Sequence, residues 1–441
     1  MSPADQKRRG ESNVSNDNYL VISSDCHAGL PNAEYREWLD PEYRETFDQH
    51  LAERARMIEL AQRGMLNQAF AAEWEEENAE GLRGGWDATR RDKELDADGV
   101  AAEVVFPDAD AVSAGASAPF GAGLAAAGDT DTALLLAGAR AHNRWLAELC
   151  ATSPERRAGV AIVPTFDVDA AVAEVARARE SGLRGGVLIP SMWAPYPPYH
   201  DPTYDPFWAV CQDLGMTVHV HSGAADKASY GAHVGIYTTE VRWWSSRPLW
   251  FLIWSGVFER FPDLRFVVTE CGAFWAADLL WTMDTVYDRE HGSRKLGDAL
   301  TAQLTRRPSE TFDTNCGIGA SNTRRRELAR RYEIGVGNLM WGNDFPHPEG
   351  TWPHTREWLR SAFHDIPVEE TRTILGGNAV EMYGFDAEAL APLASRIGPT
   401  PADLGQIGDD LDKWTSLAEA GRPWLTGVEA LPAVVVGPEV D

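Results

Sequence analysis

The chain has 441 residues, of which 67 are acidic and 40 are basic, so its formal net charge is −27. This balance excludes nucleic acid and anionic membranes as expected partners, because contact with either would begin with repulsion. The five cysteines form no C-x-x-C pair and have no regular spacing, which excludes a disulfide framework and favours a reducing cytoplasm. No stretch reaches the roughly 18 apolar residues of a membrane span.

Residues 1–18 are polar and lack the apolar centre of a signal peptide, so we expect a disordered tail. The next segment, Tyr19–His27, is typical of an apolar strand that ends in an acid-x-His pair. Side chains alternate along a strand, so Asp25 and His27 are predicted to point the same way at its carboxyl end. That is a metal-ligand arrangement, but an aspartate that caps a turn beside an unrelated histidine would give the same pattern. Both interpretations are open at this point.

A long first crossover is predicted over residues 34–98, which are rich in Glu, Arg, Ala and Leu. The second predicted strand, Val100–Phe106, carries Glu103 in the middle of an apolar run. An unpaired carboxylate is costly in such surroundings, so Glu103 needs a cation. The segment 109–128 is rich in Ala, Gly and Ser and has no period, which predicts a mobile loop that could act as a lid.

Strands and helices then alternate compactly, as parallel βαβ units require. Further strands are predicted at 158–163, 186–189, 216–221, 264–270, 311–316 and 339–344, and helices at 131–152, 168–180, 207–214, 241–258, 355–363 and 368–384. Eight strands with intervening helices predict an α/β fold, a (β/α)8 TIM barrel. We expect this barrel to span residues 19–385 and to be followed by a C-terminal extension over 386–441.

Acidic and histidine side chains fall at the carboxyl ends of these strands, where a barrel of this kind has its active site. His219 and His221 end the fifth strand on one face, and Glu270 ends the sixth. The eighth strand runs into NDFPHPEG, which carries Asp344 and His347. A lone histidine on a strand is usually a packed core residue, but two on one face at a strand end indicate a site. We expect His219 to orient His221 by hydrogen bonding.

A Pro- and aromatic-rich loop over 190–206 is suited to forming a pocket wall, as are many of the 17 tryptophans. Core packing is the alternative for most of these tryptophans. We expect Trp193, His200 and His233 to lie near the pocket mouth as candidates for contact with a substrate. Arg324–Arg326 is predicted to be a solvated helix face.

Four motifs in this order resemble the amidohydrolase superfamily, in particular its amidohydrolase-2-type barrels, which include decarboxylases of aromatic acids. The resemblance covers residues 19 to about 385. It rests on Asp25-x-His27, on His221 in VHVHSG, on Asp344 in GNDFPH and on the closing GGNAVEMYGF. It implies that these four residues bind a metal ion. Where many members have a histidine after the sixth strand, this chain has Glu270.

The carboxylate content of the site distinguishes this chain within that family. Zinc sites for hydrolysis are usually rich in imidazole, whereas carboxylate-rich mixed sites suit iron or manganese. The chain therefore resembles the dinuclear non-heme iron oxygenases of the amidohydrolase fold, which include hydroxylases of diterpenoid antibiotic pathways. This resemblance implies two divalent transition metals, with iron favoured and manganese or zinc as alternatives. The predicted ligands are Asp25, His27, Glu103, His221, Glu270, Asp344 and His347.

Two classes of activity remain open. The favoured hypothesis is a cytoplasmic monooxygenase that uses O2 and a reductant to hydroxylate a bulky apolar molecule such as a terpenoid, with Asp344 and Glu270 as catalytic residues. The alternative is a hydrolase or non-oxidative decarboxylase with one Zn²⁺ or Mn²⁺, in which Asp344 takes a proton from bound water or supports protonation of the substrate. A barrel with a vestigial site is disfavoured by the intact ligand set. The sequence leaves a homo-oligomer open.

Overall fold

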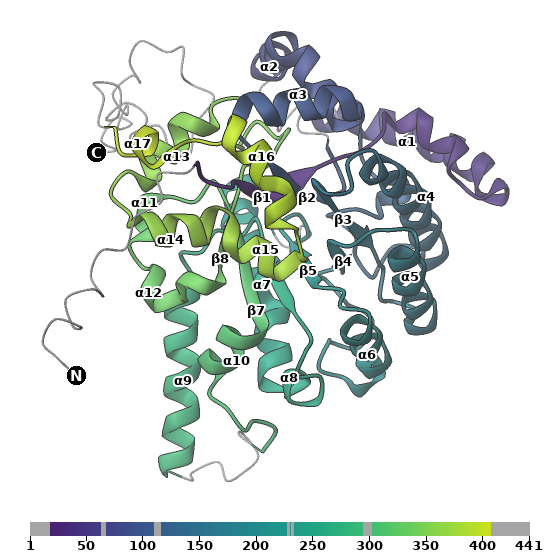
Figure 1. The fold of residues 1–441 in the computed structure, drawn as a ribbon. Coiled ribbons are helices and arrows are strands. Elements are labelled where there is room, and N and C mark those ends of the chain that lie inside the picture. The colour runs from purple at the N-terminus through teal and green to yellow at the C-terminus, as the bar shows by residue number, and fades with distance from the viewer. Residues whose placement is uncertain are drawn as a thin grey trace, which may run out of the picture.

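Eight parallel strands form one sheet in which each strand pairs with the next along the chain (Figure 1). The computed structural model describes residues 18–62, 68–109, 116–226, 230, 233–293 and 302–406. Cys26 pairs with Phe345, just after the last strand, so the barrel is nearly closed and the predicted (β/α)8 TIM barrel is confirmed. The strands are β1 (Ile22–His27), β2 (Ala102–Phe106), β3 (Arg157–Ile162), β4 (Gly186–Leu188), β5 (Val218–His221), β6 (Phe266–Thr269), β7 (Cys316–Ser321) and β8 (Leu339–Gly342).

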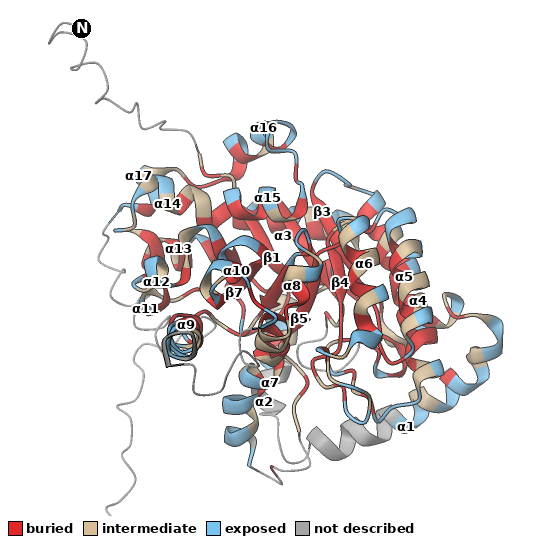
Figure 2. Cartoon of the chain, turned by 90° about the horizontal axis from the view of Figure 1, so that it is seen from below, coloured by how far each residue is buried: buried red, intermediate tan, exposed pale blue. Residues whose placement is uncertain are grey.

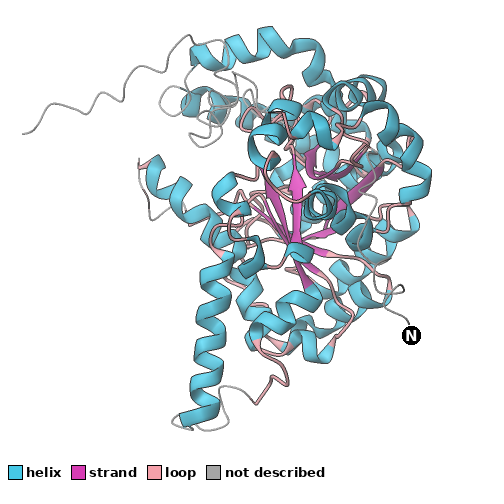
Figure 3. Cartoon of the chain, turned by 60° about the vertical axis from the view of Figure 1, so that its left-hand side comes forward, coloured by secondary structure: helices cyan, strands magenta, loops and turns pink. Residues whose placement is uncertain are grey.

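Helices surround the strands, which lie at the centre of the molecule (Figure 3). The first crossover holds three long helices and is as extended as predicted. Among the described helices, none combines the length and the apolar character needed to cross a membrane. The helices are α1 (Arg44–Gln62), α2 (Gln68–Leu82), α3 (Ala88–Asp98), α4 (Thr132–Ala151), α5 (Val168–Glu180), α6 (Asp205–Asp213), α7 (Val234–Trp254), α8 (Val257–Arg260), α9 (Ala276–Ser293), α10 (Pro308–Asn315), α11 (Arg325–Leu328), α12 (Arg331–Ile334), α13 (Thr355–Phe363), α14 (Val368–Arg372), α15 (Asn378–Tyr383), α16 (Ala387–Ile397) and α17 (Pro401–Leu404).

The predicted terminal regions are only partly described. Residues 1–17 of the predicted tail and residues 407–441 of the predicted extension lie outside the described residues. At the start of the described chain, the Tyr19 backbone N–H donates to the carbonyl of Pro399 over 2.8 Å. The domain boundaries therefore stay a prediction.

The predicted seventh strand over 311–316 is wrong. Residues 308–315 form α10, and β7 begins only at Cys316. Pro308 occupies the first turn of α10, and the Glu310 carboxylate accepts the backbone N–H of Arg307 over 2.9 Å. Both features favour a helix start. The true strand reads CGIGAS, and its glycines give it little of the β-branched or aromatic character by which strands are predicted.

Alternation along the strands separates an inner from an outer face of the barrel. Ala102, Val104 and Phe106 of β2 belong to an apolar cluster that also contains Val267 of β6 and Met340 of β8, and so lie inside the barrel. The strands that carry this cluster are buried throughout, whereas the outer helices expose one side (Figure 2). Glu103 lies between these inner positions, so its side chain points outward toward the helices.

Glu103 obtains its cation from two arginines. One of its oxygens lies 2.6 Å from Arg91 of α3, and the other lies 3.3 Å from Arg157 of β3, with all three side chains fully buried. Burial alone would raise the pKa of Glu103, but Arg91 holds that pKa below its ordinary value. Arg91 also donates to the carbonyl of His27 over 2.8 Å, which ties the ion pair to the end of β1. The structure thus corrects the prediction that Glu103 is a metal ligand, because its charge is already balanced on the outer face.

Replacing Glu103 should test this pairing. Glu103→Gln leaves the Arg91 and Arg157 charges buried without a carboxylate, so the free energy of unfolding should fall by about 3–5 kcal/mol. Asp48→Asn is the matched control, because Asp48 pairs with Arg36 on the surface and such pairs contribute roughly 0–1 kcal/mol. Urea unfolding of both variants without metal measures the difference. If the free energy of unfolding fell equally little in both variants, the buried ion pair would not stabilise the fold.

Candidate metal centre

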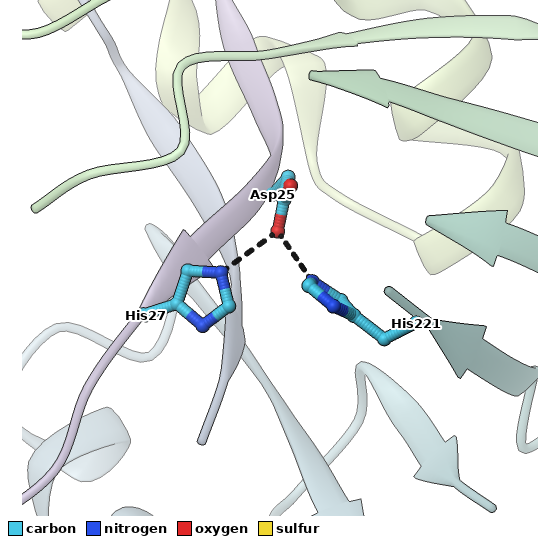
Figure 4. Close-up of side chains that lie close together, drawn as sticks. All are labelled: Asp25, His27 and His221. Atoms are coloured by element: carbon cyan, nitrogen blue, oxygen red, sulfur yellow. Dashed lines mark hydrogen bonds and ion pairs between the residues drawn. The ribbon is translucent and has the colours of Figure 1, made fainter. Parts of the chain in front are cut away.

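Four buried side chains from β1, β5 and the turn after β8 meet at the carboxyl end of the barrel. His27 Nε2 lies 3.3 Å from Asp25 Oδ1 and 3.2 Å from Asp344 Oδ1. His221 Nε2 lies 3.1 Å from the same Asp25 oxygen, so both rings face one carboxylate (Figure 4). The structure therefore brings together the four residues whose motifs predict metal binding.

Backbone contacts between β1 and the turn after β8 fix this arrangement. The Asp344 N–H donates to the Asp25 carbonyl over 2.8 Å, and the His27 N–H donates to the Phe345 carbonyl over 2.6 Å. Asp344 has φ 61° and Glu270 has φ 56°, so both residues adopt the left-handed backbone conformation that residues other than glycine rarely take. Such strain persists where the surrounding structure holds it, most often at functional sites.

Two further residues that the sequence predicts as metal ligands, His347 and Glu270, border the cluster. His347 Nδ1 lies 2.9 Å from Asp344 Oδ1, and the His347 ring stacks on His27 with 3.9 Å between centroids. Glu270 Oε2 lies 3.2 Å from His221 Nδ1. Glu270 and Asp344 also form a group of carboxylates with Glu349, whose oxygens lie within 4.8 Å of one another.

Each of the three histidines directs one ring nitrogen away from the cluster, toward a backbone carbonyl. His27 Nδ1 lies 2.7 Å from the Pro107 oxygen, and His347 Nε2 lies 2.9 Å from the Asp108 oxygen. His221 Nδ1 lies 2.9 Å from the carbonyl of the next residue. A carbonyl only accepts, so each of these nitrogens carries the proton. In a neutral imidazole the opposite nitrogen then presents a lone pair, and here that lone pair faces a carboxylate.

Four of the inward-facing atoms have no hydrogen-bond partner among the described residues. Within the described residues, His27 Nε2, His347 Nδ1 and both carboxylate oxygens of Asp344 are buried without a hydrogen-bond partner. Buried polar atoms are almost always paired, so a converging group of unpaired acceptors calls for a cation. Outward donation to a carbonyl is also how metal-binding histidines are usually oriented.

The electrostatics of the cluster favour a positive charge at its centre. Burial alone would raise the pKa of Asp25, but His221 and His27 hold that pKa well below its ordinary value. Burial opposes charge on His27 as well, yet the adjacent carboxylates of Asp25 and Asp344 hold its pKa well above the ordinary value. The field that attracts a proton here also attracts a metal ion. Two imidazole nitrogens and two carboxylates form a donor set that fits a divalent transition metal.

His219 does not orient His221 as predicted. Its Nε2 lies 3.0 Å from the carbonyl of Gly185, and its ring stacks on Tyr383. Burial lowers the pKa of His219 to about 3, so this ring is neutral. His219 is therefore a packed residue inside the barrel, below the cluster, while His221 takes its orientation from the Ser222 carbonyl and Glu270.

The three predicted substrate-contacting residues lie elsewhere. Trp193 is buried in the core against Tyr199 and Phe251. His200 is exposed and stacks on Phe251 with 5.6 Å between centroids, and His233 is exposed just before α7. None of the three lines the cavity that adjoins the cluster. Their contact with a substrate stays a prediction without support from this geometry.

A cavity of about 420 Å³ adjoins the cluster and holds functional candidates that sequence reasoning missed. Ser321, at the end of β7, donates its hydroxyl to Asp25 Oδ2, and it was missed because the strand was placed too early. Arg324 and Arg326 face this cavity, which corrects the prediction of a merely solvated helix face. The lining residues are the acids Glu270, Glu327, Asp344 and Glu349, the arginines Arg242, Arg324 and Arg326, the aromatic residues Phe274 and Trp358, and Gly272, Ser321 and Asn322.

A model of the amidohydrolase family matches residues 24–385. The chain belongs to this amidohydrolase family. It is 28% identical to a gamma-resorcylate decarboxylase of Rhodococcus jostii (strain RHA1) over 272 residues. This aligned region covers 56% of this chain and 77% of the relative. Among solved structures, 5-carboxyvanillate decarboxylase from Sphingomonas paucimobilis has a TM-score of 0.58 at 22% identity, over 83% of this chain and 99% of that one. Dihydroxybenzoic acid decarboxylase from Polaromonas sp. JS666, with bound manganese and the inhibitor 2-nitroresorcinol, has a TM-score of 0.57 at 19% identity. The match covers 83% of this chain and 98% of that one.

These relatives overturn the favoured activity. The resemblance to the amidohydrolase superfamily is confirmed, but the relatives are decarboxylases, which are lyases. The predictions of an oxidoreductase, of a monooxygenase and of a role in antibiotic biosynthesis are therefore wrong. The resemblance to a dinuclear oxygenase subgroup finds no support, and the non-oxidative decarboxylase is the better of the two hypotheses.

Loss of one cluster carboxylate should release the metal. Asp344→Asn replaces an anionic ligand by a neutral amide, a poorer donor for a divalent cation. We expect Mn²⁺ affinity to fall by at least about 10-fold while the fold is kept, as measured by calorimetric titration and circular dichroism. Glu174→Gln controls for loss of a buried carboxylate, because Glu174 on α5 pairs with Arg177 away from the cluster. Unchanged Mn²⁺ affinity in Asp344→Asn would exclude Asp344 as a ligand.

Proposed function

We propose that this protein is a non-oxidative decarboxylase of an aromatic acid that depends on one divalent metal ion, with manganese favoured. The observation that carries the proposal is the group of unpaired, buried hydrogen-bond acceptors at the carboxyl end of the barrel, on β1 and in the turn after β8. Similarity to the gamma-resorcylate decarboxylase of Rhodococcus jostii supplies the reaction class. The related structure from Polaromonas, with its bound manganese, supports the metal.

In this proposal Asp25, His27, His221 and Asp344 hold the ion, and His347 and Glu270 border it. When bound, the ion supplies positive charge that stabilises negative charge on the substrate's oxygens. One ion is favoured over the two predicted from sequence, because Glu103 is neutralised by arginines and does not reach the cluster. Iron in particular gains no support from the relatives.

The cavity beside the cluster suits an anionic aromatic substrate. The guanidinium of Arg242 lies over the Phe274 ring, 5.6 Å from its centroid, and pairs with no acid among the described residues. Arginine binds carboxylates strongly through paired N–H donors. Phe274 and Trp358 contribute aromatic surface to the cavity wall, and the cavity volume of about 420 Å³ is sufficient for a single substituted ring.

The proposed reaction needs no oxidant and no reductant. The bond between the ring carbon and the carboxylate breaks, CO2 leaves, and the electron pair stays on the ring carbon, which takes up one proton. Glu270, Asp344 and Glu349 line both the cluster and the cavity, and Glu270 and Asp344 also contact His221 and His27. In this proposal Glu270 and Asp344 carry that proton, so both keep the catalytic role predicted for them. O2 is not a partner in this scheme.

Isotope labelling tests the reaction directly. The manganese-loaded protein, incubated without oxygen in D2O with gamma-resorcylate or 5-carboxyvanillate, should release CO2 and give a product with one deuterium at the vacated ring position. Gas analysis and mass spectrometry follow the two products, and metal-free protein serves as the control. Absence of CO2 with both acids, or a product that forms only when O2 is admitted, would contradict the proposal.

A further inference from the structure

The turn after β2 supplies backbone acceptors to two histidines of the cluster. The Pro107 carbonyl accepts the His27 Nδ1 proton over 2.7 Å, and the Asp108 carbonyl accepts the His347 Nε2 proton over 2.9 Å. These two bonds decide which nitrogen of each ring faces Asp344. The conformation of this turn therefore bears on both inward-facing lone pairs.

Asp108 holds the turn in a conformation that an L-residue disfavours. Its φ is 65°, which lies in the left-handed region. Its carboxylate accepts the backbone N–H of Ala118 over 2.7 Å through Oδ1 and the N–H of Leu124 over 2.8 Å through Oδ2. The two oxygens thus bind two separate points of the described segment 116–126. These bonds offset the strain at Asp108 and fix the direction of its carbonyl.

The 116–126 segment is packed over the same end of the barrel. Ala118, Ala122 and Ala126 are buried in an apolar cluster with Leu135 and Ile162. Ala122, Gly123, Leu124 and Ala126 also line a small space together with His221. The segment closes tightly around Asp108, because a Cβ added at Gly123 would lie 2.0 Å from Asp108 Oδ2. The Asp108 carboxylate therefore fits beside residue 123 only because that residue is glycine.

We propose that Asp108 is a positioning residue that couples the seating of the 116–126 segment to the orientation of His347 and His27, and thereby sets metal affinity. If the carboxylate loses its two N–H donors, the left-handed backbone loses the two bonds that offset its strain. The carbonyl then turns away from His347, and this ring loses its fixed tautomer. The inference rests on the proposed metal-dependent function, but its direct readout does not require activity.

Two substitutions disturb this link by different routes. Asp108→Gly tolerates the positive φ and removes both anchors, so it separates loss of the anchors from backbone strain. Gly123→Ala keeps the Asp108 side chain, but its added Cβ displaces the Asp108 carboxylate. Gly121→Ala is the control in the same segment, since a Cβ there meets nothing within 4 Å, and its φ of +72° adds a backbone strain that Gly123→Ala does not carry.

Two measurements on all three variants test the proposal. Calorimetric titration with Mn²⁺ should give about 10- to 100-fold weaker binding for Asp108→Gly and Gly123→Ala, and binding near that of the unmodified protein for Gly121→Ala. In metal-free protein with ¹⁵N-labelled histidine, the slowly exchanging imidazole N–H signal that His347→Gln removes should be lost in the first two variants and kept in the control.

The outcomes separate the two proposals. An unchanged His347 signal in Asp108→Gly and Gly123→Ala, or equal losses in Gly121→Ala, would overturn the positioning role of Asp108. Loss of that signal in protein that never decarboxylates an aromatic acid would leave the positioning role standing and reject the proposed reaction. Circular dichroism of each variant confirms that it is folded, and Gly123→Ala stands in if Asp108→Gly is not.

Discussion

The active end of this barrel depends on one electrostatic constraint. Three histidines donate outward to backbone carbonyls, so their other nitrogens face the carboxylates of Asp25 and Asp344 as acceptors. Acceptors that face one another in a buried site repel unless a positive charge lies between them. Everything around the cluster follows from this requirement. The carbonyls fix the tautomers, the strained turn at Asp344 aims its carboxylate, and the cavity opens beside the site where the charge would lie.

The barrel separates side chains that the sequence places close together. Glu103 and Phe106 are both on β2 and three residues apart, so they point to opposite faces. Phe106 lies inside, 4.8 Å from the His221 ring centroid, while Glu103 faces Arg91 and Arg157. Arg91 connects the two regions through the His27 carbonyl. A structural ion pair thus supports the end of β1 without adding a ligand to the metal centre.

The fold and the central four residues could be predicted because their signals are local. Apolar strands that alternate with helices specify a parallel barrel, and the strand ends of such a barrel converge on one site. Asp25, His27, His221 and Asp344 lie at such strand ends, and the resemblance to the amidohydrolase superfamily singles them out, because the strand-end rule alone also admits His219 and Glu270. The face to which Glu103 points could not be predicted, because one strand read alone does not reveal its inner side. The glycines of β7 concealed both that strand and Ser321. The cavity roles of Arg324 and Arg326 depend on where a short helix begins against the barrel, which no local pattern encodes.

We propose a single metal ion at the centre of the site, and anomalous diffraction from crystals of the manganese-loaded protein tests this placement most directly. We expect one anomalous peak per chain within bonding distance of Asp25, His27, His221 and Asp344, with His27 and His347 still donating to the Pro107 and Asp108 carbonyls. Two peaks in the cluster would instead indicate a dinuclear centre. A peak away from these four residues, or none at saturating Mn²⁺, would contradict a metal centre at these residues.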